Sequence, residues 1–154
     1  MLISGGTAVK LHWLQMGSWY WIGVSAGLGV AIGVLLAALL AGTRLALTAA
    51  LVLAGGIGVV IGFALGQWDE ALGGGVGGVL GAIGSGQLVT GTMRRGGMRF
   101  GIAVFVGLAS VVLAAIAWIP IAGYLEAALV PAVAARLRGR APERYAGLRS
   151  LARD

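Results

Sequence analysis

Long apolar runs separated by short polar breaks divide the chain into five segments. In a bilayer the backbone finds no water to bond with, so an apolar run that crosses it is nearly always helical, and about 20 residues are long enough. The breaks fall at Thr43–Arg44, Gln67–Glu70, Thr92–Arg99 and Ile119–Gly123. The pattern therefore predicts an all-helical, polytopic membrane bundle of about five transmembrane helices. The predicted spans are residues 18–42, 45–66, 71–91, 100–118 and 121–137.

The fifth segment is the shortest and has an alternative interpretation. A single helix from Phe100 to Leu137 would be about 57 Å long at 1.5 Å per residue. The chain must therefore turn, and Pro120 marks the turn. Residues 121–137 reach about 25 Å, just short of a full hydrocarbon core, and Pro131 is expected to kink them. They either cross as a short fifth helix, which we favour, or lie on the outer surface, which leaves four crossings.

Glycine recurs at every fourth residue in the second and third spans. Residues four apart lie on one face of a helix, so each row makes a strip with almost no side chain. In membranes such strips let a neighbouring helix approach very closely. The rows are Gly58, Gly62 and Gly66; Gly73, Gly77 and Gly81, continued by Ser85; and Gly74, Gly78 and Gly86, with Ala82 between the last two. These rows predict glycine-zipper packing.

Arginines and aromatic residues predict the orientation independently of each other. With five crossings every arginine falls on one side and Lys10 on the other, and the positive-inside rule makes the arginine side cytoplasmic. Trp68, Trp118 and the cluster Trp19–Trp21 fall at the opposite interface, where aromatic rings anchor spans. We expect the N-terminus outside and the C-terminus in the cytoplasm. The bias toward alanine, glycine, leucine and arginine indicates a bacterial inner membrane.

Composition limits the class of protein. Hydrophobic residues make up 59% of the 154 and charged residues 10%, with a mean hydropathy of +0.98, whereas soluble domains carry about 25% charged residues. Cysteine is absent, which excludes thiolate catalysis and cysteine zinc sites, and His12 alone excludes bis-histidine haem ligation. We expect no catalytic residue, cofactor or metal. The arginines that give the net charge of +6 flank the apolar segments, so the membrane topology explains them and no nucleic-acid partner is expected.

The transmembrane domain, residues 18–137, is flanked by a leader, residues 1–17, and a basic amphipathic tail, residues 138–154. In the tail Tyr145 begins an apolar stripe among arginines, a pattern suited to an anionic membrane surface. The tail either only fixes orientation or also docks a cytoplasmic partner. The candidate contact residues are Arg136, Arg138, Arg140, Arg144, Tyr145 and Arg149.

Glu126 is the only acid inside an apolar segment. An ionisable residue in a membrane span is a functional hypothesis by default, here an ion or proton role. Its position near the start of the last span favours a simpler interpretation, contact with headgroups or water. Ser85, Gln87 and Thr90 form a milder polar group, which indicates interhelical hydrogen bonds or, alternatively, part of a permeation path. The pair Asp69–Glu70 is expected to be a solvated turn.

The glycine-rich span, the basic turn at Arg94–Arg95 and a following apolar helix with Glu126 resemble the proteolipid c subunit of rotary ATPases. That family places its carboxylate about half a span beyond the turn. Glu126 instead follows Arg99 by a complete span and a proline break. The resemblance therefore does not assign the chain to that family, and the residues show no other family pattern.

Two functional classes remain open. A supporting subunit needs apolar faces, close packing and a docking tail, and the sequence has all three. We therefore expect a non-catalytic accessory or assembly subunit of a larger membrane complex. The alternative is a small oligomeric transporter or channel for ions or small solutes, which needs a polar group deep in the membrane. The expected partners are the lipid bilayer, anionic lipid headgroups at the tail, and other membrane subunits or a second copy.

Overall fold

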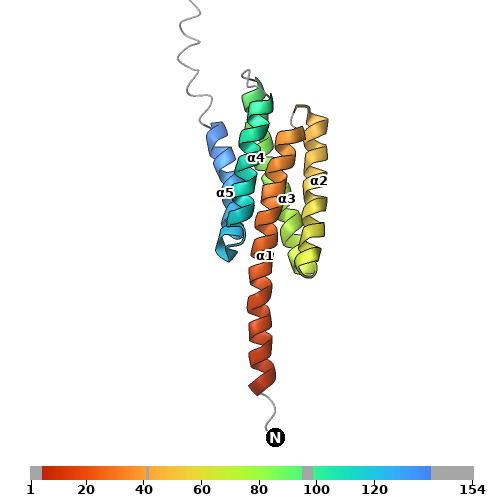
Figure 1. Ribbon diagram of the computed structural model, residues 1–154, viewed down its shortest axis with the longest axis vertical. Coiled ribbons are helices and arrows are strands. Elements are labelled where there is room, and N and C mark those ends of the chain that lie inside the picture. Colours follow the sequence, from red (N-terminus) through yellow and green to blue (C-terminus); the bar gives the residue numbers. More distant parts are fainter. Residues whose placement is uncertain (1–4, 41, 95–98, 140–154) are drawn as a thin grey trace, which may run out of the picture.

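The structure is a computed structural model that describes residues 5–40, 42–94 and 99–139. Over these residues the chain is all-helical, and the predicted fold of five helices is confirmed (Figure 1). The helices are α1 (Gly5–Leu40), α2 (Arg44–Leu65), α3 (Trp68–Arg94), α4 (Arg99–Ile116) and α5 (Pro120–Gly139).

Three of these helices are long and apolar enough to cross a membrane. The qualifying stretches are Gly17–Leu40, Arg44–Leu65 and Trp68–Thr92. Helix α4 contributes a shorter apolar stretch, Gly101–Ile116. Helix α5 is continuous through Pro131.

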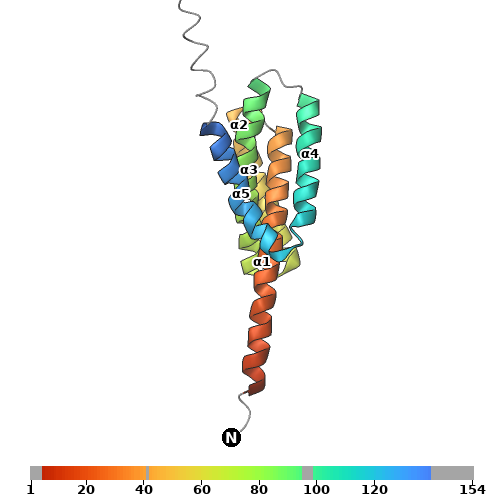
Figure 2. The same cartoon turned by 90° about the vertical axis from the view of Figure 1, so that its left-hand side faces the viewer.

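Successive helices alternate in direction along one common axis (Figures 1 and 2). The α1–α2 connection, the end of α3 and the start of α4 therefore lie at one end of the bundle, and the α2–α3 and α4–α5 connections at the other. Helix α1 is also longer than expected. Residues 5–17, predicted as a separate leader, continue the helix of the first apolar segment because no proline or turn sequence interrupts them. This part of α1 extends well beyond the other helices (Figure 1).

The helix ends carry local stop and start signals. The Thr43 hydroxyl accepts a hydrogen bond from the Ala46 backbone N–H at 3.1 Å and caps α2. At the start of α3, the Glu70 carboxylate accepts a hydrogen bond from the Gln67 N–H at 2.7 Å, which is one half of a capping box. Glu70 was expected in a solvated turn and is instead 6% exposed. It is buried because Gly66, with no side chain, leaves room for its carboxylate.

The centre of the bundle is the contact between α1 and α3, the most extensive between any two helices. The two predicted glycine rows of α3 face different neighbours. A methyl group built on Gly77 would lie 2.8 Å from the carbonyl carbon of Ala26, and one on Gly81 would lie 2.8 Å from the Cα of Val30, so this row faces α1. A methyl group on Gly74 would meet the backbone of Gly58 on α2.

Small side chains fill the space between the helices that the glycines leave open. One cluster of fully buried residues consists of Ala37, Ala54 and Ala82, contributed by α1, α2 and α3. Alanine methyl groups at a three-helix junction hold the backbones close together, and close backbones maximise dispersion contact without large side chains. Most of the large apolar side chains lie instead on the outside of the bundle, on α2, α3, α4 and α5.

Candidate functional site

Helix α5 buries a carboxyl group against α1. Glu126 is 7% exposed, and both of its carboxyl oxygens are buried without a hydrogen-bond partner among the described residues. This corrects the expectation that Glu126 contacts headgroups or water. The correction has a steric cause, because α5 approaches α1 along glycines and the side chain is enclosed between the two helices.

The glycines that enclose Glu126 come from both helices. A methyl group on Gly27 of α1 would lie 2.9 Å from the Cα of Gly123 and 3.1 Å from a carboxyl oxygen of Glu126. A methyl group on Gly123 of α5 would meet the Gly23 carbonyl and lie 3.3 Å from the Gly27 backbone nitrogen. Gly27 also packs against Ala117, because a methyl group built on Gly27 would lie 2.6 Å from the Ala117 Cβ. Without these glycines α5 would stand further from α1.

Two tyrosine hydroxyls form hydrogen bonds between α1 and the α4–α5 region, at the end of the bundle closest to Glu126. The Tyr20 hydroxyl donates to the Trp118 carbonyl at 3.2 Å, and the Tyr124 hydroxyl donates to the Trp19 carbonyl at 2.8 Å. We call this reciprocal pair the tyrosine clasp. The clasp lies at the end of the bundle from which α5 starts. Its Tyr124 precedes Glu126 by two residues along α5. The clasp and the glycine contacts together hold the Glu126 side chain in place.

The surroundings of Glu126 contain little charge. Residues 17–40 of α1, 45–65 of α2 and 101–116 of α4 include no acidic or basic residue. On α3 the acids are confined to its first turn, Asp69 and Glu70. Burying a carboxylate with no partner is costly, and such a group usually becomes neutral instead. The described residues contain no group of three or more His, Cys, Asp or Glu side chains arranged to hold a metal ion.

The polar residues of α3 bond to their own helix. The Ser85 hydroxyl donates to the Gly81 carbonyl at 2.6 Å, and the Thr90 hydroxyl donates to the Gly86 carbonyl at 2.7 Å. Gln87 is half-buried. The interhelical hydrogen bonds expected for the hydroxyls are therefore replaced by bonds to carbonyls one turn earlier in α3, as serine and threonine often make in helices.

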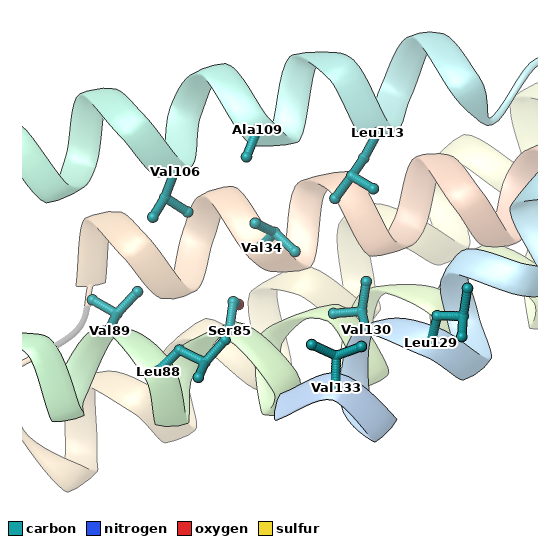
Figure 3. Close-up of a pocket in the computed structure, with 10 residues that line it drawn as sticks. All are labelled: Val34, Ser85, Leu88, Val89, Val106, Ala109, Leu113, Leu129, Val130 and Val133. Atoms are coloured by element: carbon teal, nitrogen blue, oxygen red, sulfur yellow. The ribbon is translucent and has the colours of Figure 1, made fainter. Parts of the chain in front are cut away.

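An apolar pocket of about 320 Å³ lies between α4 and α5 (Figure 3). Four helices line it: α1 contributes Val34, α3 contributes three residues that include Ser85, and α4 and α5 contribute three residues each. The pocket exists because α4 and α5 touch each other only slightly, while both pack on α1. Sequence reasoning missed it, since no periodic pattern marks a gap between two helices. The remaining lining residues are Leu88, Val89, Val106, Ala109, Leu113, Leu129, Val130 and Val133.

The predicted tail contacts are only partly described. Arg136 is exposed near the end of α5, and Arg138 belongs to the same helix. Arg140, Arg144, Tyr145 and Arg149 lie outside the described residues. The alternation of the helices brings the end of α5 to the end of the bundle that carries the α1–α2 connection (Figure 1).

Comparison with known proteins matches the chain to no family model, no curated protein and no solved structure. The function is therefore inferred from the geometry of the chain itself.

Proposed function

We propose that the chain is a five-crossing integral protein of a bacterial inner membrane, held together by glycine-zipper packing. The three long apolar helices support this, because each is long enough to span the hydrocarbon core. The outer surface of the bundle supports it too. Many exposed large apolar side chains spread over most of the helices are typical of a membrane or interaction surface. The exposed large side chains include Leu45, Val52, Val60, Phe105, Leu108 and Val111.

The proposed orientation places the N-terminus outside and the C-terminus in the cytoplasm. The alternating helix directions support it, because they put Arg44 at the start of α2, Arg94 at the end of α3 and Arg136 near the end of α5 at one end of the bundle. Asp69 and Trp68 lie at the other end. Arginines facing the cytoplasm are what the positive-inside rule requires.

Site-directed labelling checks this orientation. Since the chain has no cysteine, a single introduced cysteine is labelled without background. In intact cells a membrane-impermeant thiol reagent is expected to modify a cysteine at Gln67 and to leave one at Gly96 unmodified until the membrane is opened. The reverse pattern would contradict the proposed orientation. Equal labelling of both positions from outside would contradict a five-crossing topology.

Within that membrane we propose the role of a non-catalytic accessory or assembly subunit of a larger complex. The observation that carries this role is the sparse packing of α4. Its 18 residues pack mainly on α1 and hardly on α5, while Phe105 stays 76% exposed. The α4–α5 pocket continues this poorly packed face. A transmembrane helix of a partner subunit placed along α4 would fill the pocket and bury the exposed side chains, as close packing in membranes requires.

Quantitative recovery of partners tests the role. After purification in mild detergent, Ala109→Phe is expected to lower the recovery of a specific partner severalfold, because the phenyl ring fills the pocket between α4 and α5. Val60→Phe, at a similarly exposed valine on α2, which does not pack on α4, should leave recovery unchanged. Deleting Pro142–Asp154 should weaken recovery while membrane insertion persists. Unchanged recovery of the same partners with Ala109→Phe would contradict docking at this face.

A small oligomeric transporter or channel is the second candidate, favoured by the burial of Glu126 without a partner. Groups of this kind in membrane spans often mark ion or proton paths. The accessory role predicts that the purified protein in liposomes gives no flux of protons, ions or small solutes. A flux that Glu126→Gln abolishes would make the transporter the correct function.

A further inference from the structure

Two glutamates in the described bundle are almost equally buried and differ in their partners. Glu70 is 6% exposed, and its carboxylate accepts the Gln67 N–H at the start of α3. Glu126 is 7% exposed, and its two oxygens accept no hydrogen bond among the described residues. A satisfied helix cap explains the burial of Glu70. The same explanation is not available for Glu126.

The polar groups near Glu126 are already engaged. On α1, the Tyr20 hydroxyl donates to the Trp118 carbonyl. On α5, the Tyr124 hydroxyl donates to the Trp19 carbonyl. A methyl group built on Gly27 would lie 3.1 Å from a Glu126 carboxyl oxygen, so the carboxyl group lies beside a position of α1 that has no side chain.

Within the described side chains of the neighbouring helices, charged groups do not approach Glu126 either. The α1, α2 and α4 stretches that form the body of the bundle carry no acid or base, and the α3 acids lie in its first turn. A metal cation would need several oxygen ligands, which these surroundings do not offer. A proton needs only the carboxyl oxygen itself.

We propose that Glu126 is a proton-binding site, and that its neutral form holds α5 against α1. The neutral acid fits beside Gly27 without a counter-ion, whereas the carboxylate must be hydrated or paired. Proton binding converts the carboxylate and one proton into a carboxylic acid, and release returns the proton to water. No other reactant is involved.

The route of the proton follows from the place of Glu126 on α5. Glu126 lies six positions after Pro120, which is about 9 Å along the helix at 1.5 Å per residue. The end of the bundle nearest to Glu126 is therefore the one with the α4–α5 turn, where the two hydrogen bonds of the tyrosine clasp also lie. When Glu126 loses its proton, the carboxylate moves toward water at that end. Because the side chain is enclosed by backbone-to-backbone contacts, it can do so only if α5 moves away from α1 and the clasp opens.

This inference goes beyond the accessory role and does not depend on it. Loss of partner recovery would leave the titration of Glu126 unchanged, and a failure of the titration would leave partner docking untouched. The two proposals therefore fail separately.

Infrared spectroscopy of the purified full-length protein in lipid vesicles tests the site directly. A neutral carboxylic acid has a carbonyl stretching band that a carboxylate lacks. We expect one such band near neutral pH that disappears as the pH rises, that is lost in Glu126→Gln, and that persists in Glu70→Gln. If Glu126→Gln does not fold, Glu126→Met removes the same carboxyl with an apolar side chain of similar length. A wild-type spectrum without a Glu126 acid band would overturn the proposal.

Hydrogen exchange tests the coupling to α5. After correction for the intrinsic pH dependence of amide exchange, wild-type α5 amides are expected to exchange roughly tenfold faster or more once the acid band is lost, while α2 amides stay protected. In Glu126→Gln, which mimics the neutral acid, α5 protection should not change with pH. Equal protection of α5 in both charge states would overturn the coupling. An acid band displaced by Na⁺ or Ca²⁺ at constant pH would assign the site to a cation instead.

Discussion

Replacing Gly77 with alanine is expected to destabilise the protein, although alanine is the better helix former. The added methyl group would meet the Ala26 carbonyl oxygen and lie 2.8 Å from its carbonyl carbon. These are backbone atoms, so α1 and α3 must separate. Overpacking of this kind typically costs about 1–3 kcal/mol. Gly81→Ala should behave in the same way against Val30, and leucine at either position should abolish the folded yield.

The matched control lies on the same helix. A methyl group on Gly91 has no described atom within 4 Å, so Gly91→Ala should raise stability by up to about 1 kcal/mol, the difference in helix propensity. Thermal unfolding in one detergent compares the variants. Gly77→Leu and Gly81→Leu proteins that both keep native stability and assembly would contradict glycine-mediated packing of α1 on α3.

Replacing Gly123 with leucine is expected to detach α5 from α1 while leaving α1, α2 and α3 together. The side chain would collide with the Gly23 carbonyl, 2.7 Å from its carbon, and with the Gly27 backbone nitrogen. Because α5 packs mainly on α1 and α3 and hardly on α4, loss of this contact removes much of what holds it. Hydrogen-exchange protection should therefore fall along α5 and persist in α2.

The control for this experiment is the same substitution at Gly107 on α4. A methyl group there has no described atom within 4 Å, and Gly107→Leu should leave the protection of α5 unchanged. Separation of α5 also admits water to Glu126, so Gly123→Leu should lose the acid band while retaining the glutamate. Wild-type protection of α5 in Gly123→Leu would show that the Gly123 contact is dispensable.

The helices could be predicted from the sequence because their causes are local. Apolar runs and the breaks between them determine where a helix begins and ends, and Thr43, Pro120 and the Asp69–Glu70 pair act within one turn of their own position. The glycine rows are also local, since a spacing of four is sufficient to place residues on one helix face. The sequence therefore determined five helices and the small faces of α2 and α3.

Which helix packs on each of those small faces could be determined only from the tertiary structure. Nothing local indicates that the Gly77 row meets α1 while Gly74 meets α2, since a bare strip accepts any close neighbour. The pocket between α4 and α5 also required the tertiary structure, because it depends on how these two helices each pack on α1.

Glu126 shows the difference most clearly. Its position in the chain determined that a carboxyl group lies in an apolar helix near a turn, and that position predicted contact with water. Its burial was decided by Gly23 and Gly27, about 100 residues earlier in the chain. The missing side chains on α1 let α5 approach until the carboxyl group was enclosed. The local sequence determined that a glutamate lies in this helix. Only long-range backbone contact decided that its carboxyl group is buried without a partner.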